Sequence, residues 1–246
     1  MANNAQIEKA LKDAAKIGKQ AAVRALNDSA FNTRKHLQEQ MQTKFDRPTK
    51  FIQNSILYKK ANVADEKPTA KVYVANEPIG KGANPTNIMT PEILGGYRKY
   101  KRFEKALRYK NLLPAKMYAM PGRDAKLDQY GNISGAWIVR ILSTLQAFNE
   151  TGYLANETVR SRLAKKKALD LFVIREYKQG ELEPGIYQRQ KNKVKQLIKF
   201  IRTPKYSERF QMYKLASEFF DKDLIKQINY QLSKRGGSAG PSSDEF

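Results

Sequence analysis

The sequence contains no cysteine and only one histidine among its 246 residues. The lack of cysteine excludes disulfides, thiolate nucleophiles, zinc–thiolate sites and iron–sulfur ligation, and it fits a reducing cytoplasm. The single histidine, His36, lies inside a long helical pattern and has no Ser-His-Asp motif around it. We therefore interpret His36 as a helix-surface or packing residue and expect no cofactor.

Long apolar runs are missing as well. No stretch of about 18 apolar residues occurs, so the sequence predicts no membrane span. The N-terminal residues carry charge throughout and lack the apolar centre of a signal peptide, so we expect no export by that route. Hydrophobic residues make up 41% of the chain and aromatic residues 10%, which is typical of a folded globular protein with one large or two small domains.

Acidic residues are scarce, because 24 Asp and Glu face 46 Lys and Arg, for a formal net charge of +22. Eighteen of these charges lie in residues 98–110 (+6), 160–167 (+5) and 189–205 (+7), which contain one acid, Glu104. Bases clustered in this way repel one another until phosphates or a partner's carboxylates offset them, so we expect a charged partner; a solvated surface is the alternative for any one segment. The residues expected to face this partner are Arg98, Lys99, Lys101, Arg102, Lys105, Arg108, Lys165, Lys166, Lys167, Arg189, Lys191, Lys193, Lys195, Lys199 and Arg202.

An apolar or small residue recurs at steps of three and four from Gln6 to about Lys44, which predicts one long helix. Such a helix spans on the order of 57 Å, so its first half is expected to project from the body. The stripe is rich in alanine and glycine, which favours close packing against a neighbouring subunit; an internal helical hairpin is the alternative. The residues expected at the subunit interface are Leu11, Ala14, Gly18, Ala21 and Ala25.

Pro48 ends this helix, and the patterns beyond it predict both strands and helices. The expected strands are residues 55–61 and 70–75 as an antiparallel pair, 112–120, 169–174 and 194–201. Residues 76–91 are rich in Gly and Pro and are expected to form a surface excursion, and residues 149–167 read as a loop with some helix. Between the last two strands, residues 179–192 read as a connection.

Capping residues indicate where helices of the body begin. Thr90 before Pro91 is a typical N-cap with proline at the first helical position, and Ser134 can cap the amide of Trp137 or its neighbour. Apolar spacing predicts helices near residues 97–110, 134–148 and 210–234. The inward residues expected on the last helix are Tyr213, Ala216, Phe220, Leu224 and Ile228.

The fold class that follows is α+β, with a long N-terminal helix and a small antiparallel β-sheet of about four to five strands with several packed helices. We expect residues 1–47 to form an assembly helix, residues 48–235 an α+β body and residues 236–246 a flexible tail.

Six runs of the sequence, taken together and in order, carry a resemblance to a known group of proteins. The runs are ALNDSAFNTRKHLQEQM, FDRPTKFIQNSI, GGYRKYKRFEKALR, LLPAKMYAMPG, LDQYGNISGAWIVRIL and RTPKYSERF. They resemble bacteriophage and prophage proteins described as minor tail or tail-completion proteins, similar to the prophage minor tail protein Z family. The resemblance covers most of residues 20–235, and none of the runs is an enzymatic signature. Residues 76–91 and 149–160 are longer here than in the family pattern.

The resemblance implies a virion structural protein, not an enzyme, at the neck or head-proximal tail, assembled in the host bacterial cytoplasm. It implies a homo-oligomeric ring that completes the tail or joins it to the head around the DNA channel. The implied partners are neighbouring neck, portal or tail proteins and genomic double-stranded DNA, with no membrane. A ring repeats each basic segment by its copy number, and the segments face either DNA phosphates or acidic surfaces of a neighbouring ring.

Two other functions stay open. A DNA-binding or packaging accessory protein would use the same bases on duplex phosphates, although the sequence has no recognisable reader element such as a helix-turn-helix. A metal-dependent nuclease is suggested by Asp170, Glu176 and Lys178, whose D-x5-E-x-K spacing would supply two carboxylates for Mg²⁺ and a lysine to activate water. In a chain with 28% charged residues this spacing arises easily by chance, and a strand followed by a solvated turn is the simpler interpretation.

Overall fold

The structure is a computed structural model that describes residues 4–77, 84–147, 169–177 and 182–236. The chain forms two compact units: unit 1 comprises Met1–Leu94 with Glu208–Phe246, and unit 2 comprises Gly95–Ser207. This division differs from the expected helix, body and tail, because the last helix returns to the first one and residues 48–94 lie with both. Residues 237–246, most of the expected tail, lie outside the described ranges.

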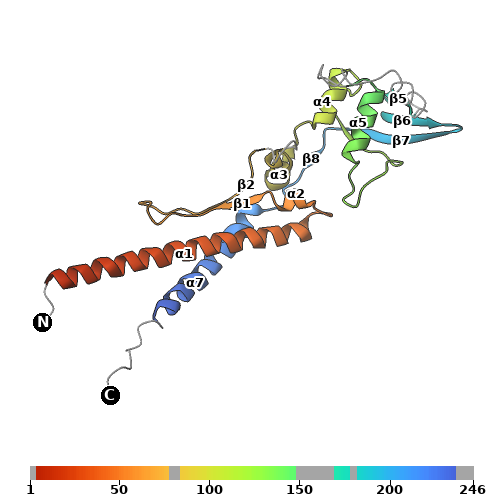
Figure 1. Cartoon of the computed structure of the whole chain (residues 1–246). Helices are drawn as coiled ribbons and strands as arrows, with labels where there is room; N and C mark the ends of the chain where they lie inside the picture. The colour runs from red at the N-terminus through yellow and green to blue at the C-terminus, as the bar shows by residue number, and fades with distance from the viewer. Residues whose placement is uncertain (1–3, 78–83, 148–168, 178–181, 237–246) are drawn as a thin grey trace. The chain divides into compact units, whose positions relative to one another are not determined.

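Unit 1 is organised around two long helices, α1 (Asn4–Lys44) and α7 (Met212–Gly236), which lie against each other as Figure 1 shows. Two side-chain hydrogen bonds link them, from Asn32 to Asp223 at 3.0 Å and from Gln231 to Asp28 at 3.1 Å. Later residues of α1 meet earlier residues of α7, so the two helices pack antiparallel. The predicted long N-terminal helix is confirmed, and its second half forms the internal helical pair that was the alternative.

The interface between α1 and α7 mixes aromatic and polar contacts. The ring of His36 stacks on Phe219 with centroids 4.3 Å apart, which confirms that His36 is a packing residue. The expected inner face of α7 is wrong in part, because Tyr213 is 70% exposed and Ile228 is also exposed. The buried position near the end of α7 is instead the polar Gln231, which bonds to α1.

A β-hairpin lies against α1 in the same unit. Its strands, β1 (Ile56–Lys59) and β2 (Lys71–Val74), pair antiparallel as predicted, and the short helix α2 (Lys50–Gln53) precedes them. Arg34 Nε donates to the carbonyl of Ile56 at 2.9 Å, which ties α1 to the start of β1. The core of unit 1 is formed by Leu37, Met41, Ile56, Met89, Ile93, Phe210 and Met212.

The part of the expected surface excursion that the structure describes is largely helical. Helix α3 (Pro85–Leu94) begins with a proline at its first position, and the Asn84 side chain accepts a hydrogen bond from the Thr86 amide at 2.9 Å. The predicted start at Thr90 is therefore wrong, and Pro91 lies inside the helix. Asn84 and Pro85 form the same kind of start signal, a capping residue followed by proline, six residues before Thr90 and Pro91.

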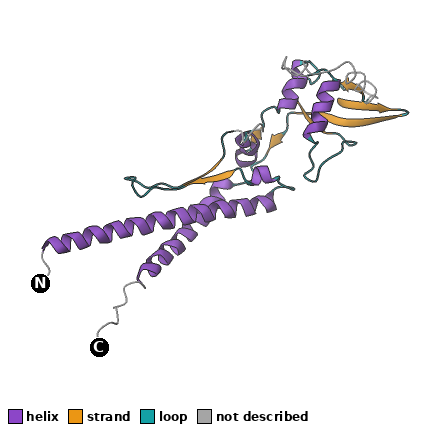
Figure 2. Ribbon diagram, viewed as in Figure 1, coloured by secondary structure: helices purple, strands orange, loops and turns teal. Residues whose placement is uncertain are grey.

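Unit 2 contains a four-stranded antiparallel sheet with the order β4-β7-β6-β5 (Figure 2). Its strands are β4 (Met117–Pro121), β5 (Asp170–Ile174), β6 (Gly185–Gln190) and β7 (Lys193–Arg202). Helices α4 (Arg102–Tyr109) and α5 (Gly135–Thr144) pack against this sheet through a core that includes Leu107, Ile141, Ile186, Ile198 and Phe200. Together with α1, this arrangement confirms the α+β fold class.

Local signals located several of these elements. Ser134 caps α5 as predicted, accepting a hydrogen bond from the Trp137 amide at 3.3 Å, and β5 and β7 lie where strands were expected. Strand β6 was expected to be a connection, and that expectation is wrong. The chain also pairs with itself where it starts and ends unit 2, through β3 (Gly96–Tyr97) and β8 (Lys205–Tyr206).

Replacing Leu37 by alanine is expected to lower the free energy of unfolding of unit 1 by about 2–5 kcal/mol, because it leaves a cavity in a fully buried position. The matched control is Leu11→Ala on the same helix, where the side chain is exposed and the change should stay within about 0.5 kcal/mol. Urea unfolding followed by far-ultraviolet circular dichroism measures both. Equal losses in the two variants would contradict the assignment of this core.

Candidate functional site: the basic surface of unit 2

The positive charge of the chain is concentrated in unit 2. Residues 95–207 contain 25 Lys and Arg against 9 Asp and Glu, a net of +16, whereas the rest of the chain has 21 against 15, a net of +6. All three predicted basic segments belong to this unit. The candidate site is therefore the set of exposed bases on unit 2.

The first basic segment contains a structural ion pair. The carboxylate of Glu104, in the first turn of α4, is fully buried, and Arg98 donates to both of its oxygens at 2.5 and 2.7 Å. The backbone amides of Lys101 and Ala119 donate to the same carboxylate at 2.7 and 2.8 Å. With these partners a buried carboxylate is satisfied, and it joins the segment before α4, the helix itself and β4.

Arg98 is consequently a structural residue and not a free cation. Burial, the largest single influence, lowers the pKa of Arg98, but the hydrogen bonds to Glu104, the charge of that carboxylate and the contact with Tyr206 together raise the pKa above its ordinary value. The guanidinium also lies over the ring of Tyr118, 4.6 Å from its centroid. The expectation that Arg98 faces an external partner is corrected, because its charge is already compensated inside unit 2.

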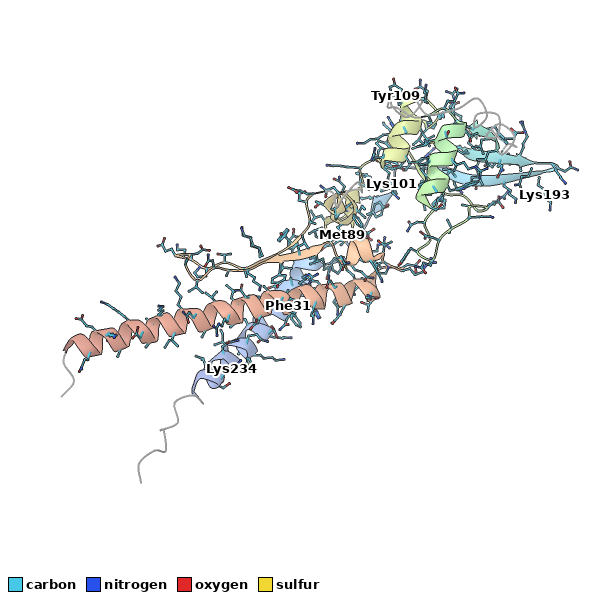
Figure 3. The ribbon with its side chains drawn as sticks, viewed as in Figure 1. Phe31, Met89, Lys101, Tyr109, Lys193 and Lys234 are labelled. Carbon is cyan, nitrogen blue, oxygen red and sulfur yellow. The ribbon has the colours of Figure 1, made fainter. Side chains whose placement is uncertain are left out.

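Arg108 is held in a similar way. Its guanidinium donates to the hydroxyl of Tyr100 at 3.0 Å and lies over the ring of the same tyrosine, which in turn stacks on Tyr118. The lysines of the segment, Lys99, Lys101, Lys105 and Lys110, are exposed, as is Arg102 (Figure 3 labels Lys101). The first segment therefore divides into two arginines that hold the fold and a set of exposed bases around α4.

The second basic segment, which includes Lys165, Lys166 and Lys167, lies outside the described residues. The third segment covers the end of β6, the turn, β7 and the first residue of β8, and most of its bases are exposed. Arg189 lies 3.8 Å from the carboxylate of Asp170 and over the ring of Phe172. These contacts hold the Arg189 side chain along β5 while more than half of it stays exposed.

A β-bulge distributes the lysines of β7 over two faces of the sheet. Ile198 pairs with Ile186 and Gln196 with Tyr187, so Leu197 has no partner across the ladder. Because side chains alternate along a strand, Lys193 and Lys195 share one face whereas Lys199 lies on the other. Lys199 donates to Glu183 at 3.0 Å, and this hydrogen bond with the lysine charge lowers the pKa of the glutamate.

The predicted subunit interface on α1 contains both exposed and buried positions. Leu11 is 66% exposed, and Ala14 and Gly18 are exposed as well, so these three positions are open to another molecule. Ala21 and Ala25 are 4% and 0% exposed within the single chain, so the expectation that they face a neighbouring subunit is wrong. They lie in the half of α1 that packs with the rest of unit 1.

The structure describes two of the three residues of the possible nuclease motif. Asp170 is exposed and lies beside Arg189, Glu176 is exposed beyond the end of β5, and Lys178 lies outside the described residues. Within the described part of the chain, no group of three or more His, Cys, Asp or Glu side chains is placed to hold a metal ion.

Comparison of the chain with protein-family models, curated proteins and solved structures finds no match. Among the residues that the structure describes, no helix is both long and apolar enough to cross a membrane. Functional proposals therefore depend on the residues and geometry above.

The sequence did not distinguish the bases that stabilise the fold of unit 2 from the bases that are exposed. The one signal available was Glu104, the single acid in the first segment, which lies three residues after the N-cap residue Lys101, where a capping carboxylate is common.

Replacing Glu104 by glutamine is expected to destabilise unit 2 by about 3–5 kcal/mol, because the guanidinium of Arg98 loses its buried counter-charge. The matched control is Glu183→Gln, whose partner Lys199 is exposed, with an expected loss below about 1 kcal/mol. Fluorescence of Trp137, the single tryptophan and a neighbour of the unit 2 core, follows the unfolding of this unit. A loss in Glu104→Gln no greater than the control's would contradict the structural role of the pair.

Proposed function

We propose that the protein is a structural component of a phage virion, at the neck or head-proximal tail, where identical copies form a ring that completes the tail or joins it to the head. The observation that carries the proposal is the exposed first half of α1, in which residues 8–19 are all exposed. A helical segment of about 12 residues is marginally stable in water by itself, so packing against another molecule would stabilise it. The ordered sequence runs that resemble minor tail proteins supply the location.

The charge distribution also supports an assembly. A ring would repeat the +16 of unit 2 once per copy and turn separate basic surfaces into a continuous field. Such a field attracts DNA in a central channel or acidic surfaces on neck, portal or tail proteins. The protein would act in the virion after assembly in the host cytoplasm.

A DNA-binding or packaging accessory protein is the second candidate, and the concentration of charge in unit 2 favours it. The two functions differ in their response to salt. Binding to DNA phosphates weakens steeply as ionic strength rises, whereas a ring held by apolar helix contacts persists. Native mass spectrometry over a range of ammonium acetate concentrations separates them.

Assembly is tested by adding bulk on the exposed face of α1. Ala14→Leu with Gly18→Leu should reduce oligomer formation, because leucine prevents close approach of a second helix. The single chain should keep its fold, since a Cβ added at Gly18 meets nothing within 4 Å and leucine favours the helix.

The matched control is Asp13→Leu with Lys16→Leu, which adds two leucines to the opposite face of the same exposed half at unchanged net charge. Oligomer mass by native mass spectrometry, and infectivity of particles carrying each variant, are the readouts. Equal assembly in the two double variants would overturn the proposed interface.

The proposal includes no catalytic step. Purified protein incubated with plasmid DNA and Mg²⁺ or Mn²⁺ is expected to leave the plasmid intact, and Asp170→Ala should behave like the unmodified chain, because the carboxylate of Asp170 already neighbours Arg189. Agarose electrophoresis measures strand breaks. Cleavage that disappears in Asp170→Ala would establish a nuclease instead.

A further inference from the structure

The β6–β7 hairpin ends in a concentrated group of cations. Residues 189–194 are all exposed, and Lys195 is half-buried. Within this tip, four bases alternate with neutral residues, and no acid occurs from Gly185 to Ser207. The bases of the tip are Arg189, Lys191, Lys193 and Lys195. Figure 3 shows Lys193 at the free end of the hairpin.

Among the residues that the structure describes, three of these bases have no ion-pair partner. Among the described residues, the acid nearest to the tip that forms an ion pair is Asp170, and its partner is Arg189. Within those same ranges, no ion pair reaches Lys191, Lys193 or Lys195. Because of the bulge at Leu197, Lys199 lies on the face of the sheet opposite to Lys193 and Lys195. Glu183 pairs with Lys199 on that face and not with the tip lysines.

The backbone at the turn adds a further observation. Lys191 has a φ of 49°, in the left-handed region that glycine and asparagine occupy most readily. A lysine is less favourable than glycine in this backbone conformation, and its long side chain lies at the end of the hairpin. The turn therefore carries a cation at a position where stability alone would favour a smaller residue.

The composition of the tip fits nucleic acid better than protein. Protein–protein interfaces are depleted in lysine and rely on buried aromatic or apolar anchors, and the only apolar side chain of the tip is Val194. Duplex DNA instead offers one negative charge per about 1.7 Å of helix axis, and its major groove, about 12 Å wide, admits a two-stranded β-ribbon. Lys193 and Lys195 share one face of the hairpin and lie about 7 Å apart along the strand. The side-chain amides of Gln190 and Asn192 can donate hydrogen bonds to phosphate oxygens.

We propose that the β6–β7 hairpin tip binds the phosphate backbone of double-stranded DNA, independently of base sequence. The inference names the partner of one basic segment and so rests on the proposed function for its setting. Its test uses purified protein and short duplexes, so it succeeds or fails separately from ring assembly, which native mass spectrometry of the same variants reports.

The test variant is Lys191→Gln with Lys193→Gln and Lys195→Gln. Its matched control removes the same three charges from α7, as Lys214→Gln with Lys222→Gln and Lys226→Gln, all exposed in unit 1. A second variant replaces the three tip lysines by arginine and keeps their charge. Anisotropy of a labelled duplex of about 20 base pairs gives the binding constant as salt is raised from about 50 to about 200 mM.

If each tip lysine contacts one phosphate, the tip variant loses about 2.7 from the slope of the logarithm of affinity against the logarithm of salt. Across that salt range the affinity of the unmodified chain should then fall about 40-fold more than that of the tip variant. The α7 variant should follow the unmodified chain, and the arginine variant should retain the full slope. Two duplexes of unrelated sequence should bind equally.

Equal slopes for the tip and α7 variants would overturn the proposal, since only total charge would then matter. A tip variant that binds DNA normally but loses affinity for polyglutamate would overturn it in favour of an acidic protein partner. Retention of binding by the arginine variant alongside loss in the glutamine variant, with unchanged Trp137 fluorescence in both, would support the proposal and exclude misfolding of unit 2.

Discussion

The buried carboxylate of Glu104 is the contact on which the organisation of unit 2 depends. It accepts hydrogen bonds from Arg98, from the amide that starts α4 and from the amide of Ala119 in β4, so one side chain fixes three parts of the chain. A buried charge is tolerated only when such partners surround it, and removing any one of them exposes the cost of burial. The pairing also removes the single acid of the first basic segment from the surface, which leaves cations there.

Scarcity of acids extends this effect through the unit. With 9 acids for 25 bases, most bases of the unit have no acid to pair with; among the described residues, Arg98 pairs with Glu104, Arg123 with Asp124, Arg189 with Asp170 and Lys199 with Glu183. The exposed bases include those around α4 and at the tip of the β6–β7 hairpin. The candidate surface is therefore defined by the scarcity of carboxylates as much as by the presence of lysines.

Signals confined to a few neighbouring residues allowed prediction of α1, the β1–β2 hairpin and the Ser134 cap, because each depends on periodicity or capping within one segment. The sequence did not reveal β6, whose glycine and glutamines lack apolar alternation and whose pairing with two other strands is a tertiary property. The inner face of α7 was predicted only in part, because the prediction considered apolar residues alone. In the structure, the polar residues Asp223 and Gln231 form hydrogen bonds with α1. The face occupied by Lys199 depends on a bulge, which strand alternation alone does not predict.

The small-residue stripe of α1 shows why one pattern can carry two roles. Ala21 and Ala25 are buried within unit 1, whereas Ala14 and Gly18, on the same stripe, are exposed. Small residues permit close packing against any helix, so the pattern is the same whether the partner is α7 or a second molecule. The two halves of the stripe differ in whether the rest of unit 1 packs over α1. This packing begins between Lys19 and Ala21. Lys19 donates a hydrogen bond to the carbonyl of Asp65. In the proposed assembly, a change before this point is expected to alter association, whereas a change after it is expected to alter the fold, so the expected effect of a substitution on the stripe depends on the half in which it lies.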